Sequence, residues 1–229
     1  MNIYFCSKLK AFLLKNFIQI TSHDNILVLP ICTMTSYVND ENQWEKYYGM
    51  NGIQSRKIEE QLLQVGATKD NIYFYNYYSR SDSDVNWNKT YSFLVLPGGD
   101  AELGTQRMIK CGIIDQIKNF RGDIIAYSAG ALMLFDKYFL SPNWYYKQMQ
   151  YCYGLNIYGM PSWLLEVHYD NTEEMDNYIF EACRTIGKKV FAVTNDGLIC
   201  YDVDSKNVKL AGEVYEFNIE GEKLVKHCL

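Results

Sequence analysis

The residues of this sequence best suited to chemistry are a serine and a histidine that each follow a short apolar run. Ser128 lies in Asp123-Ile-Ile-Ala-Tyr-Ser-Ala-Gly-Ala-Leu-Met-Leu134, where small residues flank the serine and an apolar helical pattern follows. A buried strand, a sharp turn and a helix are typical of a nucleophile elbow, which exposes a serine hydroxyl at the end of a strand. Neighbouring amides and the helix N-terminus can then stabilise an oxygen that becomes negative beside Ser128. This stretch alone leaves open the alternative that Ser128 merely caps a helix.

A serine hydroxyl is un-ionised at neutral pH, so it needs a base within hydrogen-bond reach. The sequence holds three histidines. His23 lies in a polar turn and His227 lies two residues from the end, so both are expected at the surface. His168 follows the predicted strand 163–167, as Ser128 follows its own strand. A hydrogen-bonded loop histidine is the alternative, but the matching position of Ser128 favours His168 as the base.

A third apolar run, 92–96, leads into Pro97-Gly98-Gly99-Asp100. Gly99 can offer an unobstructed backbone N–H, and Ala129 directly follows the serine, so these two amides are the candidate oxyanion hole. Gly98 and Gly99 could instead form only a tight turn. Because sites in open α/β sheets form where loops leave the carboxyl ends of strands, these groups are expected to meet at one edge of a sheet.

The elements that must position these residues alternate between strand and helix. Strands are predicted at residues 2–6, 25–30, 71–78, 92–96 and 124–127, and helical patterns at 9–20, at 43–65 with an interruption near Gly49 and Gly52, and from Ala101 onward. Runs such as 25–30 are continuously apolar, as in strands buried on both faces. The alternation predicts an α/β fold with a mostly parallel sheet and helices on both faces.

The second half of the chain changes character. Residues 136–160 are aromatic and irregular, 163–167 form a predicted strand, and 172–186 form a helix capped by Asn171 or Thr172. Short strands are predicted at 190–194, 198–203, 208–210, 214–218 and 223–227, with turns at 195–197, 204–207 and 220–221. These strands are expected to extend the sheet edge in antiparallel fashion. The polar stretch 79–89 is expected to be a surface loop.

Composition narrows the class of protein. A chain of 229 residues is expected to form one α/β domain over residues 1–229. The net charge of −5 and the lack of a Lys/Arg stripe argue against nucleic-acid binding. Seven cysteines without a C-x-x-C pair predict free thiols in a reducing compartment and no structural zinc. With no signal peptide and no apolar run near the ~18 residues of a membrane span, a soluble, cytoplasmic protein without membrane contacts is expected.

Taken together, these motifs resemble the peptidase E group of serine peptidases, relatives of cyanophycinase with a class I glutamine amidotransferase-like, flavodoxin-like fold. The matching stretches, which span nearly the whole chain in order, are Pro97-Gly98-Gly99-Asp100, Tyr127-Ser128-Ala129-Gly130-Ala131, His168-Tyr169-Asp170 and the strand-rich end from Asp196-Gly197. The resemblance implies Ser128 as nucleophile, His168 as base, and Gly99 and Ala129 as oxyanion donors. It also implies hydrolysis of short peptides, in peptidase E itself of dipeptides beginning with aspartate, without a metal or organic cofactor.

The sequence departs from the family pattern around the third member of the triad. Ala126 stands two residues before the serine, where glycine is usual. Where the family has an acid after the nucleophile, the stretch 141–147 offers only Asn143. An asparagine can orient a histidine, although it stabilises the imidazolium less than a carboxylate does. Glu166 and Asp170 flank His168, and Glu166 is the better candidate because it lies on the same strand face as His168. Asp136 is a weaker third choice.

The sequence also departs from the family at the position expected to select the substrate. The helix after His168 begins Thr172-Glu-Glu-Met-Asp176, which is acidic where an aspartate-selecting arginine is expected, and Arg184 lies too late to replace it. An acidic rim would disfavour an acidic substrate. The sequence therefore predicts a serine hydrolase that acts on a small peptide or related amide, with two alternatives: a binding or regulatory protein with a weakened triad, and an esterase-like hydrolase. Fold alone cannot choose among these.

Overall fold

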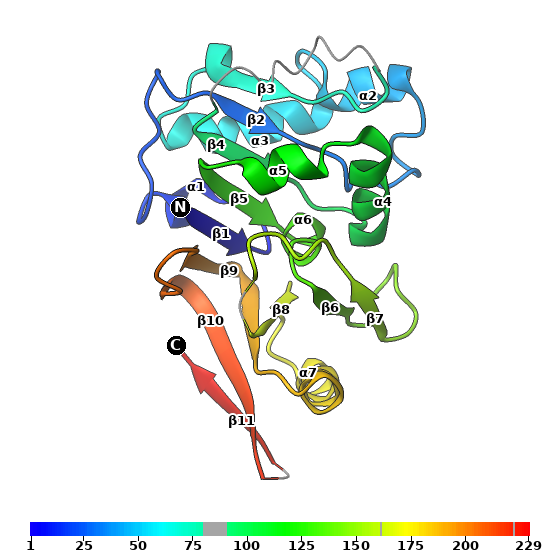
Figure 1. Ribbon diagram of the computed structural model, residues 1–229, viewed down its shortest axis with the longest axis vertical. Coiled ribbons are helices and arrows are strands. Elements are labelled where there is room, and N and C mark those ends of the chain that lie inside the picture. The colour runs from blue at the N-terminus through cyan, green and yellow to red at the C-terminus, as the bar shows by residue number, and fades with distance from the viewer. Residues whose placement is uncertain (80–90, 161, 222) are drawn as a thin grey trace.

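A sheet whose centre is built from the predicted apolar runs extends through the protein (Figure 1). The computed structural model describes residues 1–79, 91–160, 162–221 and 223–229, so nearly all of the predicted loop at 79–89 lies outside the described residues. Five parallel strands stand in the order β1 (Asn2–Cys6), β5 (Asp123–Tyr127), β4 (Phe93–Leu96), β2 (Ile26–Val28) and β3 (Ile72–Phe74). The predicted mostly parallel α/β sheet is confirmed.

Helices cover both faces of this sheet, because its strands are apolar on both sides. In β1, Ile3 and Phe5 contribute to one core cluster, whereas Tyr4 and Cys6 contribute to the other. The first cluster includes residues of α4 (Ala101–Cys111), α5 (Ile114–Asn119) and α6 (Ala129–Leu132). The second includes residues of α1 (Ala11–Leu14), α2 (Glu41–Tyr48) and α3 (Ile53–Gln64), and a 3-10 turn (Lys69–Asn71) precedes β3.

The helix predictions were right in kind and partly wrong in length. The interruption near Gly49 and Gly52 is real, since it separates α2 from α3. The helical pattern predicted over 9–20 yields only the four-residue α1.

The antiparallel extension of the sheet is confirmed, but its strands are longer than predicted. β9 (Val190–Asp202) and β10 (Val208–Glu220) each join two segments that were predicted as separate strands, whereas β11 (Lys223–Cys228) matches its prediction. The predicted turn at 195–197 is wrong, because these residues lie within β9. Val193 pairs with Val214, and Gly197 pairs with Gly212. Between these two pairs β9 spans four residue steps, whereas β10 spans only two. The surplus makes a bulge, which bends a strand and redirects its side chains.

Two strands share one edge of β9 and meet end to end. The first half of β9 pairs in parallel with β8 (Leu164–Val167), and its second half pairs in antiparallel fashion with β1. Because β1 and β8 therefore run in opposite directions, their carboxyl ends face each other across the bulge. This junction brings Ser7 and His168 together.

The remaining elements surround the junction. The irregular stretch 136–160 contains a two-stranded sheet, β6 (Lys137–Leu140) with β7 (Gln150–Tyr153), that the sequence did not predict. Helix α7 (Glu173–Ile186) matches its prediction, and the Thr172 side chain caps it by accepting from the Met175 amide. The α7 residues Ile179 and Ala182 pack in a third cluster with residues of β8, β9 and β10.

All seven cysteines are free thiols. Within the described ranges, no helix combines the length and the apolar character that a membrane crossing needs.

Candidate active site

Ser128 lies between the end of β5 and the start of α6 in a strained backbone conformation. Its φ of 53° and ψ of −128° fall outside the regions that non-glycine residues ordinarily adopt. Its N–H donates to the carbonyl of Cys6 at 3.0 Å, which ties the turn to the end of β1. The side chain makes no capping bond to α6, so the helix-cap interpretation is wrong. Strain of this kind concentrates at functional sites.

The small residues around Ser128 are required by close backbone approach. A Cβ added to Gly98 would lie 2.8 Å from Cβ of Ser128, and one added to Gly130 would lie 2.2 Å from the carbonyl oxygen of Leu96. Real Cβ atoms do not tolerate either distance. The pattern of small residues in the sequence therefore reflects contact between the elbow and the end of β4.

His168 contacts the serine directly. Its Nε2 lies 2.9 Å from Oγ of Ser128, although the two residues are 40 positions apart. His168 has a φ of 59°, and its N–H donates at 2.8 Å to Oγ of Ser7, which in turn donates at 2.7 Å to the carbonyl of Val193. Ser7 is fully buried and thus joins the ends of β1 and β8 to β9. His23 and His227 are exposed, as predicted.

Asn195, a residue predicted to lie in a turn, orients the histidine. Its Oδ1 lies 2.9 Å from Nδ1 of His168. Because an amide oxygen can only accept, Nδ1 must carry the proton, which leaves Nε2 free to accept the hydroxyl hydrogen of Ser128. The bulge in β9 presents Asn195 to the junction. An Asn-Asp-Gly tripeptide inside an apolar strand pattern also signals a bulge, and that signal could have identified the residue.

The two residues expected to orient His168 do not do so. Glu166 accepts a hydrogen bond from Oγ of Ser141 at 2.9 Å. Asn143 accepts from the amides of Tyr145 and Tyr146, at 2.8 and 2.9 Å. The same-face argument for Glu166 failed because the positive φ of His168 ends the alternation of β8 at that residue.

Asp136, the weaker third choice, pairs instead with Lys188 at 3.4 Å.

The environment of His168 favours the neutral imidazole. Surrounding protein withdraws water from part of the ring, and this desolvation lowers the pKa of His168 below its ordinary value of 6.5. The positive charge of Lys8 lowers it further, whereas the hydrogen bond to Asn195 acts in the opposite direction. A neutral imidazole at physiological pH is the form that can accept a proton from Ser128.

The two candidate oxyanion donors, Gly99 and Ala129, line the same pocket as Ser128. Gly99 has a φ of 142°, and an added Cβ would lie 1.9 Å from the carbonyl oxygen of Cys32, so glycine is required there. The loop is held in place, because the Asp100 amide donates to that carbonyl at 2.6 Å and the Asp100 carboxylate accepts from the Tyr145 hydroxyl at 3.0 Å. The loop that carries the first donor is thus fixed on two sides.

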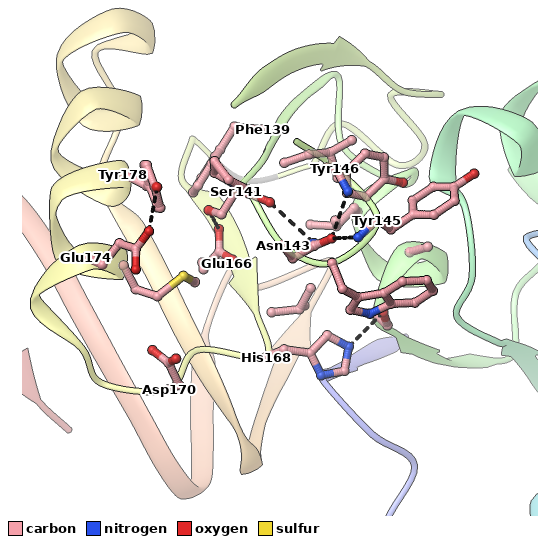
Figure 2. Close-up of a pocket in the computed structure, with 18 of the residues that line it drawn as sticks. Phe139, Ser141, Asn143, Tyr145, Tyr146, Glu166, His168, Asp170, Glu174 and Tyr178 are labelled. Carbon is pink, nitrogen blue, oxygen red and sulfur yellow. Dashed lines mark hydrogen bonds between the residues drawn. The ribbon is translucent and has the colours of Figure 1, made fainter. Parts of the chain in front are cut away.

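Ser128 and His168 line a pocket with a volume of about 460 Å³. Figure 2 shows the carboxyl groups of Glu166, Asp170 and Glu174 on one side of it and the rings of Tyr145 and Tyr146 on the other. Of the described residues that line it, none is lysine or arginine. Arg184 lies over the Phe180 ring instead.

Comparison with known proteins supports the fold. No protein-family model and no curated protein matches the sequence. Several solved structures do match, and two of them align with the whole chain at 14% sequence identity each. A 1.5 Å crystal structure of a candidate peptidase E protein from Listeria monocytogenes EGD-e matches with a TM-score of 0.59 over 98% of its own chain. A peptidase from an acI-B1 Actinobacterium matches with a TM-score of 0.61 over 96% of its chain. The chain therefore has a peptidase E-like fold.

Proposed function

We propose that this protein is a serine hydrolase that cleaves short peptides or related amides. One observation carries the proposal: Oγ of Ser128 lies 2.9 Å from Nε2 of His168, on a strained strand-to-helix turn that faces a pocket. A nucleophile, a base in hydrogen-bond contact and a third residue behind the base are the arrangement that nucleophilic catalysis needs. The peptidase names of the two structural neighbours agree with this proposal.

The residues suggest how each step would proceed. Oγ of Ser128 attacks the substrate carbonyl carbon while Nε2 of His168 takes the hydroxyl proton. The Gly99 and Ala129 amides donate to the resulting oxyanion. His168 then gives its proton to the leaving nitrogen, the C–N bond breaks and an acyl-enzyme remains. Water, activated by His168, attacks this ester, and His168 returns the proton to Ser128 as the acid product leaves.

Intact-mass spectrometry after fluorophosphonate treatment tests the proposal. The wild-type protein is expected to gain one adduct, while Ser128→Ala and His168→Ala gain none. Ser205→Ala is the matched control, because it removes an exposed serine that does not line the pocket. This variant should be labelled to the same extent as wild type. A wild-type protein that gains no adduct under conditions that label other serine hydrolases would refute the proposed hydrolase.

One observation favours a second candidate function, a binding or regulatory protein. Asn195 is neutral, so it stabilises an imidazolium less than a carboxylate would. An esterase-like hydrolase is compatible with the same feature, because esters demand less of the leaving-group acid. Turnover of dipeptides but not of aryl esters would select the peptidase, the reverse would select the esterase, and neither would leave the binding protein.

Free thiols at all seven cysteines support a cytoplasmic location as part of this proposal.

A further inference from the structure

Glu166 is a buried carboxyl group in the wall of the proposed catalytic pocket. Its relative exposure is 5%, and it lines the same pocket as Ser128 and His168. Among the described residues, Ser141 donates a hydrogen bond to Oε2 of Glu166 at 2.9 Å. A buried carboxylate without a positive partner is costly, so the group stays neutral or waits for a cation.

Among the residues that the structure describes, none forms an ion pair with Glu166. Desolvation raises the pKa of Glu166 to about 8, and the negative charge of Asp170 adds to this effect. The described lining residues include neither lysine nor arginine, and two further carboxyl groups, Asp170 and Glu174, stand on the same side (Figure 2). Among the described lining residues, none can therefore supply a positive charge beside Glu166.

The two other carboxyl groups bond to residues close to them in the sequence, at the start of α7, and both are exposed, whereas Glu166 is buried. Asp170 accepts from the amide and the hydroxyl of Thr172, at 3.2 and 2.7 Å, at the start of α7. Glu174 accepts from the Tyr178 hydroxyl at 2.8 Å. Ser141 alone does not explain a carboxyl at position 166, because a glutamine would accept the same bond without the cost of a charge.

We propose that Glu166 binds a cationic group, an ammonium or guanidinium, of the residue that provides the scissile carbonyl of the substrate. This inference rests on the proposed hydrolase function and names its substrate class. Apolar side chains beside the carboxyl groups, among them Leu132, Phe139 and Met175, suit the aliphatic stem of a basic side chain. An acidic substrate would be repelled, which separates this pocket from one selective for aspartate.

Matched dipeptides test the proposal through hydrolysis. Lys-Ala and norleucine-Ala differ only by the terminal ammonium, and N-acetylation of each removes the α-ammonium. A charge-assisted hydrogen bond should give wild type a kcat/KM at least about tenfold higher for Lys-Ala than for norleucine-Ala, and Glu166→Gln should abolish this ratio. If the α-ammonium is the group bound, N-acetylation should instead cost about tenfold in wild type and nothing in Glu166→Gln.

Glu173→Gln is the matched control, because it removes the same charge from an exposed neighbour of Glu174 that does not line the pocket. Glu173→Gln should keep the wild-type preference, whether this is for Lys-Ala over norleucine-Ala or for the free over the N-acetylated peptides. Equal rates for all four peptides, or a preference that survives in Glu166→Gln, would overturn the proposal.

Calorimetry separates this inference from the hydrolase itself. The same peptides are titrated into Ser128→Ala, alone and combined with Glu166→Gln or with Glu173→Gln. Tighter binding of the cationic peptide that is lost only with Glu166→Gln supports the cation site even if wild type hydrolyses nothing. Equal binding of cationic and neutral peptides rejects it even if wild type is labelled by a fluorophosphonate.

Discussion

Nδ1 of His168 donates a 2.9 Å hydrogen bond to Oδ1 of Asn195, so a neutral amide stands where a serine hydrolase triad commonly has a carboxylate. The amide fixes the tautomer of the ring but adds no charge to stabilise the imidazolium. The bond thus positions His168 and raises its pKa as a neutral hydrogen bond does, without the negative charge that a carboxylate would add.

Asn195→Asp should raise kcat about tenfold or more, because a carboxylate at this position stabilises the imidazolium that forms during attack. It should also move the acid limb of the pH–rate profile to higher pH, since it raises the pKa of His168. Asn143→Asp is the control, because it adds the same charge at a residue that does not contact the imidazole. Equal profiles for the two variants would show that Asn195 does not act through His168.

Activity of the wild-type protein should persist below the pH at which an ordinary histidine becomes protonated. The base must be neutral, and desolvation together with Lys8 lowers the pKa of His168 below 6.5. kcat/KM should therefore stay level through neutral pH and fall only under more acid conditions. Lys8→Met should shift that fall to higher pH. An NMR titration of the His168 ring, assigned with His168→Ala, checks the same pKa, and a value above 6.5 would contradict the prediction.

The free energy of unfolding should decrease between about pH 5 and pH 8 because of Glu166. Its pKa is raised from 4.5 to about 8 in the folded protein, so the folded state holds a proton that the unfolded state has lost. The contribution of Glu166 to the free energy of unfolding is therefore fully present below pH 4.5, and it is lost as the pH rises toward 8. Glu166→Gln should match wild type near pH 5 and exceed it near pH 8.5 by on the order of 1–4 kcal/mol. Urea denaturation of both proteins at pH 5 and at pH 8.5 measures this. A difference in unfolding free energy between Glu166→Gln and wild type that is the same at both pH values would contradict the prediction.

Gly98→Ala should reduce hydrolysis at least about tenfold, because the new methyl group would stand 2.8 Å from Cβ of Ser128 and displace the nucleophile. The cost in stability should be about 1–3 kcal/mol, as for other overpacked sites. At Gly159 an added Cβ meets nothing within 4 Å, so Gly159→Ala should keep wild-type rates despite its positive φ. Fluorophosphonate labelling rates of the two variants make the comparison, and equal rates would show that the close contact is unimportant.

The centre of the fold and two of the site residues were predictable because their signals are local. Continuous apolar runs identify strands buried on both faces, and a strand that ends in a small or polar residue identifies Ser128 and His168. The need for small residues at Gly98, Gly99 and Gly130 was also predictable, because close approach of the backbone leaves no room for a side chain there. Each of these features depends on a few neighbouring residues.

Asn195 and the pair β6 and β7 were missed because their environment is set by distant parts of the chain. Asn-Asp-Gly is typical of a hairpin turn, and only pairing with β1, β8 and β10 makes it part of one strand with a bulge. Glu166 was chosen from strand alternation, which the positive φ of His168 interrupts. Backbone geometry of this kind follows from tertiary contacts rather than from residue type.

The pairing of β1 with β9 has a consequence for synthesis of the chain. Asn2 lies opposite Asp202, so one edge of β1 has no partner until the ribosome has made most of the protein. Until then the apolar Tyr4, Phe5 and Cys6 are exposed to other chains through an open strand edge, which is a hazard for aggregation. Ser128 likewise cannot contact His168, and His168 cannot contact Asn195, until β8 and β9 have joined the sheet. A nascent or truncated chain that ends before residue 190 should therefore be both inactive and prone to aggregate, and recovery of activity during refolding should report one of its last steps.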